Sequence, residues 1–466
     1  MFGLTTGLAI LLVVCILCAC LFEFINGFHD TANAVATVIY TKSLKPTTAV
    51  IWSGIVNSLG VFFGGIGVTL GIVSLLPIET LIDSNIYHNL GMVMALLLTA
   101  IIWNLATWYV GIPCSSSHTL IGSILGVGLG YSLMYDKADA VNWTKAGEIG
   151  TALLVSPLVG FSIAIILMFI LRRLLTKKSV IFKETDPEQK PPFWIRFILI
   201  ATSTLVSFFH GSNDGQKGIG LMMLILIAIV PGYFALNSEK DIKDLKPALV
   251  TVHNMVDKID QKELKGKDTV EFKKMMASIS KLDTLVTKTA EQQAETKSKF
   301  GYRKHILVIG KCYDNLLKGG HVNLSLENQK ILKKEGIGKM KSFTDFAPGW
   351  VIALISISLG LGTMIGWKRI VVTIGEKIGK QNITYAQGAS AQLVAATTIA
   401  LAGAYNLPVS TTHVLSSGVA GSMVASKGVK NLQSKTIRNI LIAWVLTLPV
   451  CMTMAGLLFW IFRMIF

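Results

Sequence analysis

Apolar stretches long enough to cross a bilayer dominate this 466-residue chain. A membrane-spanning helix needs about 20 mostly apolar residues, because the hydrocarbon core is about 30 Å thick. Seven stretches approach or exceed that length: 7–25, 90–110, 149–171, 194–209, 219–236, 350–366 and 439–462. Four more are rich in Gly, Ser and Ala: 47–76, 119–134, 387–404 and 411–425. The pattern predicts an all-α polytopic membrane protein with about 10 to 12 transmembrane helices, some of them broken or re-entrant.

The positive charge of the chain lies between the apolar stretches. The formal net charge is +16, although only 15% of the residues are charged. Lys and Arg gather in residues 172–196 and in residues 237–345, where 22 of them stand against 15 Asp and Glu. Basic loops mark the cytoplasmic side of a membrane protein. This distribution argues against nucleic acid as a partner and predicts that both segments are cytoplasmic.

Two short motifs each occur twice, which indicates an internal duplication. The sequence Gly-Phe-His-Asp-Thr-Ala-Asn-Ala at 27–34 returns as Gly-Ser-Asn-Asp-Gly-Gln-Lys-Gly at 211–218. The sequence Pro-Cys-Ser-Ser-Ser-His at 113–118 returns as Pro-Val-Ser-Thr-Thr-His at 408–413. The copies are 184 positions apart for the first motif and 295 for the second. The second copy therefore contains an insertion, and the polar segment 237–345 has the required length.

The insertion predicts the register of the rest of the second copy. Elements that follow it should keep the offset of 295, so that Gly65, Gly67 and Gly71 correspond to Gly360, Gly362 and Gly366. We expect the two copies to be inverted relative to each other, since this arrangement is common in transporters that alternate between two states.

The chain is therefore expected to have five parts. They are membrane repeat 1 (1–171), a cytoplasmic basic linker (172–193), the first part of membrane repeat 2 (194–236), an inserted cytoplasmic helical domain (237–345) and the second part of membrane repeat 2 (346–466). In the insertion, apolar residues such as Val252, Val256 and Ile259 recur at helical spacing. A regulatory module and a plain helical hairpin both remain open for it.

Acidic residues inside the apolar stretches are candidates for function. Asp30 and Asp214 occupy matching positions of the two copies. A carboxylate at mid-membrane costs roughly 2.5–3.5 kcal/mol on insertion scales, so a symmetric pair favours binding of a cation over an accident of sequence. A structural ion pair or a helix cap is the alternative. Glu23, one turn before Gly27, is a weaker candidate of the same kind.

The second motif predicts an anion site. Its proline interrupts an apolar stretch and favours the start of a helix. The hydroxyl groups that follow then lie in the first turn, where backbone N–H groups are unpaired and the helix dipole is positive. Two copies that face each other could enclose a tetrahedral oxyanion, whereas ordinary capping and close helix packing are the alternative. The candidate hydroxyl residues are Ser115, Ser116, Ser117, Ser410, Thr411 and Thr412.

Histidines and one lysine complete the candidates. His118 and His413 follow the hydroxyls directly and could carry protons or be satisfied buried rings. His29 and His210 do not align between the copies, so they rank below these two. Lys217 stands where the first copy has Asn33. It could neutralise Asp214, add charge for an anionic substrate, or simply extend toward the interface.

These motifs resemble those of the inorganic phosphate transporter (PiT) family, whose duplicated signature is Gly-Ala-Asn-Asp-Val-Ala-Asn-Ala. The resemblance covers both membrane halves. It is strongest to the bacterial low-affinity, proton-coupled branch, with matches at 27–37, 213–220 and 373–380. It implies that Asp30, Asn33 and Asp214 line a central site and that the six hydroxyl residues contact phosphate.

The same resemblance bears on the coupling ion. Sodium-coupled members carry Ala-Asn where this chain has Gln216-Lys217, so a symmetric sodium site is in doubt. We expect Lys217 to take the place of a coupling cation, with protons driving uptake and His118, His413 and Glu23 as candidates for proton coupling. The resemblance also implies that phosphate is carried as a neutral complex with a divalent metal. It does not say which residues bind the metal.

The leading hypothesis is a secondary active phosphate importer that works by alternating access, with no cofactor and no enzymatic activity. Its expected partners are phosphate, a coupling cation and the lipid bilayer, and its expected location is the bacterial inner membrane. Whether it forms a homo-oligomer is open. A sodium-coupled phosphate permease, a sulfate permease of the same family and a passive channel are alternatives. An intramembrane hydrolase is disfavoured, because adjacent Ser117 and His118 would point about 100° apart on a helix.

Overall fold

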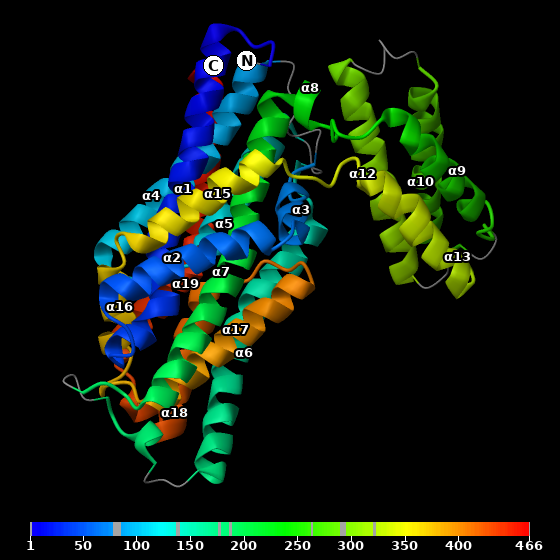
Figure 1. Ribbon diagram of the computed structural model, residues 1–466. Coiled ribbons are helices and arrows are strands. Elements are labelled where there is room, and N and C mark those ends of the chain that lie inside the picture. The colour runs from blue at the N-terminus through cyan, green and yellow to red at the C-terminus, as the bar shows by residue number, and fades with distance from the viewer. Residues whose placement is uncertain are drawn as a thin grey trace. The chain divides into compact units, whose positions relative to one another are not determined.

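The computed structural model describes residues 2–77, 85–136, 140–175, 179–185, 189–261, 264–288, 295–319 and 323–465. The described residues contain helices and two isolated β-bridges but no strand. The predicted all-α fold is confirmed (Figure 1). Contacts divide the chain into two compact units. The membrane unit comprises Thr5–Ile225 and Pro348–Phe466, and the inserted unit comprises Leu226–Ala347 with the N-terminal residues up to Leu4.

The membrane unit consists of two series of helices. The first series is α1 (Thr6–Tyr40), α2 (Pro46–Phe63), α3 (Gly67–Val73), α4 (Ile86–Val110), α5 (Ser116–Tyr135) and α6 (Trp143–Leu174). The second series is α7 (Phe193–Ile229), α15 (Gly349–Met364), α16 (Lys368–Val372), α17 (Tyr385–Ala404), α18 (Thr411–Lys427) and α19 (Ser434–Ile465). The 3-10 helix Val180–Phe182 lies between them, in a linker of which residues 176–178 and 186–188 lie outside the described part.

Six of the described helices are long and apolar enough to cross a membrane: α1, α2, α4, α6, α7 and α19. A seventh span results if α15 is joined to the segment Lys368–Lys377, across a bend of 56°. The membrane-protein class is thus confirmed, while the predicted total of crossings stays a prediction. The stretches 194–209 and 219–236, which the sequence separates, are mostly joined in the single helix α7, because the polar motif between them continues the helix.

The two series of helices share local features at matching places. Gly65, at φ +78°, breaks the chain between α2 and α3, and Gly366, at φ +73°, breaks it between α15 and α16. Glycine adopts this backbone region readily because it has no Cβ atom. These two breaks are 301 positions apart, so the predicted register of Gly65 with Gly360 is wrong by six residues. Gly360 and Gly362 lie inside α15, and the second copy is shorter after its break.

Helices of one series pack against helices of the other through glycines. A Cβ atom on Gly27 of α1 would come within 2.3 Å of the carbonyl oxygen of Leu359 on α15. A Cβ atom on Gly211 of α7 would come within 2.1 Å of the carbonyl oxygen of Asn57 on α2. In the same way α5 packs on α19 and α18 packs on α6. Each motif helix is therefore held by a helix from the opposite series.

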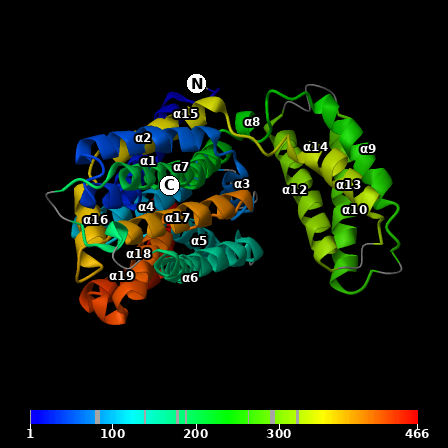
Figure 2. The same ribbon diagram turned by 60° about the horizontal axis from the view of Figure 1, so that its bottom comes forward.

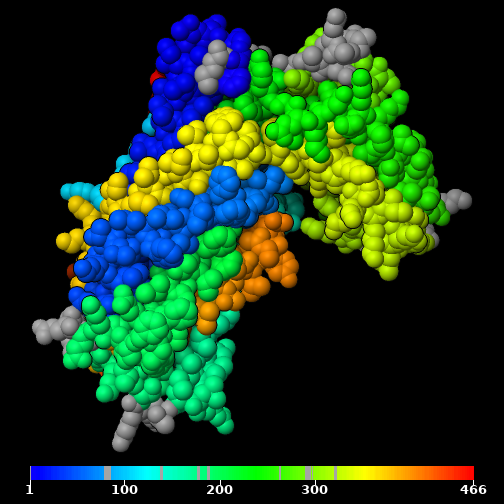
Figure 3. Space-filling view, in the orientation of Figure 1, coloured from blue at the N-terminus to red at the C-terminus, as the bar shows by residue number. Residues whose placement is uncertain are grey.

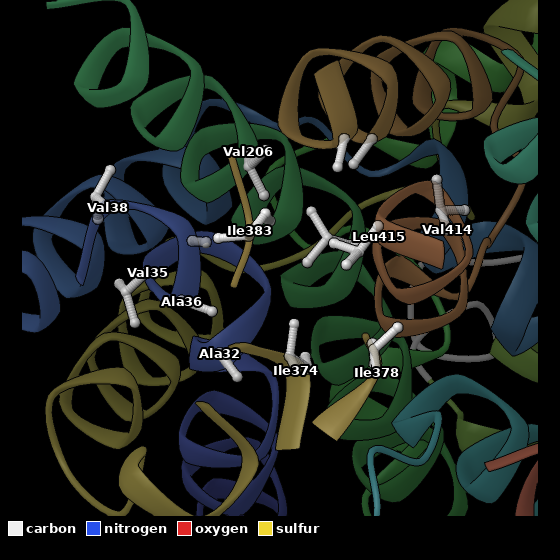
Figure 4. Packing of buried hydrophobic residues seen from close by; sticks show 14 of the residues in the cluster. Ala32, Val35, Ala36, Val38, Val206, Ile374, Ile378, Ile383, Val414 and Leu415 are labelled. Atoms are coloured by element: carbon white, nitrogen blue, oxygen red, sulfur yellow. The ribbon is translucent and has the colours of Figure 1, made fainter. Parts of the chain in front are cut away.

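Two further views show the core of the membrane unit. Figure 2 shows α1 and α7 between the α2–α15 pair and helices α5, α6 and α18. Figure 3 shows α2 (blue) and α15 (yellow) side by side on the surface. An apolar cluster that includes Val35, Val206 and Leu415 fills the space between α1, α7 and α18 (Figure 4). The long helices are mostly exposed on one side, with Leu158 of α6 68% exposed, as expected for faces that meet lipid.

The inserted unit has its own core. Its helices are α8 (Pro231–Phe234), α9 (Leu245–Val256), α10 (Lys267–Val286), α12 (Thr296–Gly319), α13 (Leu326–Ile331) and α14 (Lys339–Lys341), with a π-helical segment at Leu332–Gly338. Val252, Val256 and Ile259 are buried in it, as their helical spacing predicts. Arg303 on α12 donates to the carbonyl oxygens of Ala235 and Thr344, which closes both ends of the unit. Burial lowers the pKa of Arg303 to about 10.

Candidate functional site

The ten residues predicted to bind substrate all lie in the interior of the membrane unit. None of them is more than 3% exposed. They come from α1 and α7, which carry the first motif, and from the starts of α5 and α18, which carry the second. The structure therefore brings both predicted motif pairs into one buried region. The residues are Asp30, Asn33, Ser115, Ser116, Ser117, Asp214, Lys217, Ser410, Thr411 and Thr412.

The first-copy carboxylate is joined to a second-copy hydroxyl. Thr412 Oγ1 donates a hydrogen bond to Asp30 Oδ1. Asn33 Nδ2, one turn further along α1, donates to the same Thr412 oxygen at 3.1 Å. Asn33 Oδ1 is buried with no hydrogen-bond partner in the described part of the chain. Among the described residues, the ion-pair partners of Asp30 are the histidines His29 and His210, and no lysine or arginine pairs with it.

The second-copy carboxylate has a lysine instead. Lys217 Nζ lies 2.6 Å from Asp214 Oδ1, and it also donates to Ser117 Oγ at 2.5 Å and to the carbonyl oxygen of Val409 at 2.7 Å. Ser117 Oγ donates in turn to the Val409 oxygen at 3.1 Å. Lys217 is 3% exposed, so its ammonium group stays inside the protein and does not extend to the interface. Three oxygen atoms surround it, as they would a small metal cation.

The six hydroxyls at the starts of α5 and α18 differ in what they bind. Ser115 and Ser410 are N-caps, whose Oγ atoms accept from the backbone N–H groups of His118 and His413, each at 3.2 Å. Thr412 donates to the Asp30 carboxylate, whereas Ser117 accepts from the Lys217 ammonium group and donates to the Val409 carbonyl oxygen. Ser116 Oγ and Thr411 Oγ1 are buried without a hydrogen-bond partner among the described residues.

His118 and His413, predicted as candidates for proton coupling, lie against each other. Their ring centroids are 4.6 Å apart, and His413 stacks on Trp444 of α19 at 3.9 Å. His118 Nδ1 bonds to Ser115 Oγ at 2.8 Å. The contact shows that the starts of α5 and α18 face each other, which is the arrangement the second motif predicts.

Glu23, the third candidate for proton coupling, is fully buried on α1. It accepts from Asn26 Nδ2 at 3.2 Å through Oε2, whereas Oε1 has no hydrogen-bond partner among the described residues. Its side chain packs on Gly218, where a Cβ atom would come within 2.3 Å of Glu23 Oε1. The matching position of the second copy is Ser207, so the acid belongs to one copy alone.

His210, which the alignment of the two repeats ranked low, lies among the candidate residues. Its Nε2 atom lies 3.7 Å from Asp30 Oδ2 and 3.5 Å from Asp214 Oδ2, so it stands between the two carboxylates. The copies do not align at this position, which hid its role. The spacing of four residues to Asp214 on one apolar helix was the available signal.

His29, the other histidine ranked low, lies at the edge of the site. Its Nδ1 atom is 3.4 Å from Asp30 Oδ1, and its Nε2 atom bonds to Thr107 Oγ1 at 3.3 Å. Both of its ring nitrogens therefore have neighbours that can bond to them.

Known proteins are similar to this chain along nearly its whole length. A family model described as the phosphate transporter family matches residues 26–455. The chain belongs to the phosphate transporter family. The chain is 41% identical to the low-affinity inorganic phosphate transporter PitA of Escherichia coli K12, with 98% of each chain covered. It is 30% identical to a probable low-affinity inorganic phosphate transporter of Bacillus subtilis, with 98% of this chain and 99% of that one covered.

A solved structure supports the fold. The sodium-dependent phosphate transporter matches 98% of this chain and 100% of its own, with a TM-score of 0.53 and 19% identity. Membership of the phosphate transporter family confirms the resemblance read from the motifs. It makes the chain a transport protein and not an enzyme. The bacterial relatives and the long apolar helices confirm a multi-pass protein of the inner membrane.

Proposed function

We propose that the protein is a secondary active importer of inorganic phosphate, driven by protons and working by alternating access. Family membership supports phosphate as the substrate. The unpartnered hydroxyls of Ser116 and Thr411 support a place for it. They lie in the first turns of two facing helices, where free N–H groups and the positive end of the helix dipole favour an anion.

One observation carries the choice of coupling ion: the buried contact of Lys217 with Asp214, Ser117 and the Val409 carbonyl. A sodium ion bound by this half of the site would need the same oxygen atoms. Because the ammonium group is part of the chain, it cannot travel across the membrane as a coupling ion does. Lys217 therefore supports a coupling ion other than sodium at this position.

Glu23 is the residue best suited to carry the proton. Asp30 and Asp214 each have a histidine or lysine neighbour, while no ion pair is recorded for Glu23 among the described residues. Its Oε1 atom is buried with no hydrogen-bond partner among the described residues and is therefore free to accept a proton. Glu23→Gln should abolish uptake driven by a pH gradient but preserve phosphate–phosphate exchange across the liposome membrane. Normal uptake driven by a pH gradient in this variant would exclude Glu23 as the proton carrier and leave His118 and His413 as the candidates.

The transported species is proposed to be phosphate in a neutral complex with a divalent metal. When His210 is neutral, two carboxylates and one ammonium group leave one net negative charge in the interior of the site, which disfavours a free phosphate dianion. A dication bound together with the phosphate removes that repulsion. The carboxylates Asp30 and Asp214 are suited to hold such an ion, because carboxylate oxygens are common ligands of divalent metals.

The test is uptake of radiolabelled phosphate into proteoliposomes that contain the purified protein. A pH gradient, acidic outside, should drive accumulation in the complete absence of sodium. A sodium gradient at constant pH should not. Accumulation only with sodium would favour the alternative of a sodium-coupled permease, and equal competition by sulfate would favour a sulfate permease. Equilibration without accumulation would indicate a channel.

A further inference from the structure

Asp30, His210 and Asp214 form a cluster with the geometry of a metal site. One ligand atom from each side chain can be chosen so that all three lie within 4.8 Å of one another. All three residues are buried, with at most 2% exposure. Asp30 comes from α1, while His210 and Asp214 lie one turn apart on α7. The cluster therefore joins the two motif helices.

The two carboxylates each use one oxygen for the protein and present the other to the cluster. Asp30 Oδ1 accepts from Thr412, and Asp214 Oδ1 binds Lys217. The Oδ2 atoms of both residues face His210 Nε2, at 3.7 Å and 3.5 Å. The bonds of the Oδ1 atoms fix the orientation of the carboxylates. Two oxygens and one nitrogen therefore remain close to one another and available as ligands.

A chain of hydrogen bonds fixes the proton of His210. Thr363 Oγ1 donates its hydrogen to the carbonyl oxygen of Leu359 at 2.8 Å, so it accepts from Asn57 Nδ2 at 2.9 Å. The amide group of Asn57 then turns Oδ1 toward His210 Nδ1, at 3.2 Å. Nδ1 therefore carries a hydrogen. Metal-binding histidines commonly donate their second N–H group in this way, which fixes the ring and its tautomer.

The same bonds leave Nε2 of His210 free to bind a metal. This atom is buried and has no hydrogen-bond partner in the described part of the chain. When the ring is neutral, Nε2 holds a lone pair that points between the two carboxylates. A buried polar atom without a hydrogen-bond partner is costly, and a metal ion bound between the carboxylates would remove that cost.

We propose that Asp30, His210 and Asp214 bind one divalent transition-metal ion, of the class of Mn²⁺, Fe²⁺, Co²⁺ or Zn²⁺. Metal–ligand bonds of about 2.1 Å at a tetrahedral ion separate the ligand atoms by about 3.4 Å. The two separations from His210 are 3.5 Å and 3.7 Å, and all three ligand atoms lie within 4.8 Å of one another. An imidazole ligand favours these ions over Mg²⁺ and Ca²⁺, which prefer oxygen ligands only. Three protein ligands leave a position for a phosphate oxygen.

The site gives the proposed metal-phosphate substrate a place in the structure, and its use in transport rests on that proposed function. Charge supports the combination. Two carboxylates and the Lys217 ammonium group leave one net negative charge, and a dication reverses its sign. A buried positive centre then attracts phosphate in a region where charges are weakly screened. The competing interpretation is a protonated His210 that forms ion pairs with both carboxylates and excludes a metal.

Binding of Mn²⁺ to the full-length protein in lipid nanodiscs, without phosphate, separates these interpretations. Electron paramagnetic resonance of free Mn²⁺ gives the affinity and the number of sites, and competition by Zn²⁺ gives its affinity. His210→Phe should weaken binding by more than about 100-fold. His253→Phe is the control, since it removes a histidine of the inserted unit whose ion pair is with Asp257 and not with a carboxylate of the cluster. It should leave the affinity unchanged.

A second variant guards against loss of folding. His210→Cys replaces a nitrogen ligand with sulfur, which should shift the preference of the site toward Cd²⁺ by about tenfold or more relative to Mn²⁺. A purely structural histidine would not produce that shift. Equal Mn²⁺ binding by the wild-type, His210→Phe and His210→Cys proteins would overturn the proposal, as would a wild-type protein that binds neither Mn²⁺ nor Zn²⁺. Because no transport is measured, failure of proton coupling leaves these results unaffected.

Discussion

The two halves of the site use the same framework with different charges. In the first, Asn33 donates to Thr412, which in turn donates to the Asp30 carboxylate. In the second, Lys217 takes the position of Asn33 and joins Asp214 to Ser117. Glu23, which has no acidic counterpart in the second copy, packs on Gly218 beside that lysine. The two halves thus share a framework, and a base in one half and an acid in the other make them chemically distinct.

Removal of the second-copy carboxylate tests the strongest contact of the comparison. Asp214→Asn leaves the buried Lys217 ammonium group without its anionic partner, and breaking such a pair costs about 3–5 kcal/mol. We expect phosphate uptake to fall by at least about 100-fold, while the protein still inserts and elutes as a single species. Asp257→Asn, at an exposed position of the inserted unit, is the matched control. Full uptake by Asp214→Asn would contradict its place in the site.

Lys217→Asn makes the second half resemble the first. The variant removes the fixed cation, so Asp214 needs a mobile one. In sodium-free medium, proton-driven uptake should fall by about tenfold to 100-fold. Sodium should then stimulate uptake in the variant but not in the wild type. Uptake that sodium leaves unchanged in both proteins would show that the lysine does not replace a coupling cation.

Thr412, which donates to Asp30, and Ser117, which accepts from Lys217, should differ in their importance for uptake. Thr412→Val removes a donor to Asp30 and an acceptor for Asn33, and unsatisfied buried groups cost about 1–3 kcal/mol. Uptake should fall by about tenfold. Ser117→Ala should reduce uptake only by about threefold, because Lys217 retains its contacts with the Asp214 carboxylate and the Val409 carbonyl oxygen. The measurement is the initial rate of phosphate uptake into proteoliposomes. Equal losses of uptake in the two variants would contradict the expected difference between the two halves of the site.

Packing should be the same in both halves. Gly27→Ala and Gly211→Ala each place a methyl group against a backbone carbonyl of the opposite series, which should cost about 1–3 kcal/mol of stability. Both variants should lower the midpoint of thermal unfolding in detergent by similar amounts. Gly147→Ala on α6, where a Cβ atom meets nothing within 4 Å, is the control. A large effect in only one of the two would show that the framework is not shared.

The sequence predicted the components of the site better than their contacts. Asp30, Asp214, Lys217 and the hydroxyl residues were found from repeated motifs, and the structure brings them together. It could not be predicted that Thr412 meets Asp30 while Ser117 meets Lys217, because those contacts depend on long-range helix packing. Short glycine patterns recur too often to fix a register, which is why Gly65 was matched to the wrong glycine. His210 ranks low in the sequence analysis because alignment of the repeats selects residues that occur in both copies, and the first copy has no histidine at the position that matches His210.

The exchange of partners between the two series of helices has a consequence for how the chain is made. Helix α5 packs on α19, which is synthesised about 300 residues later. At about 5–20 residues per second, α5 is in place for roughly 15 to 60 seconds before its main partner emerges from the ribosome. During that time its glycine-rich face, including Gly122 and Gly126, lacks the α19 backbone that later covers it. Synthesis of the second half therefore completes the first, so a truncated first half would be a target for membrane quality control.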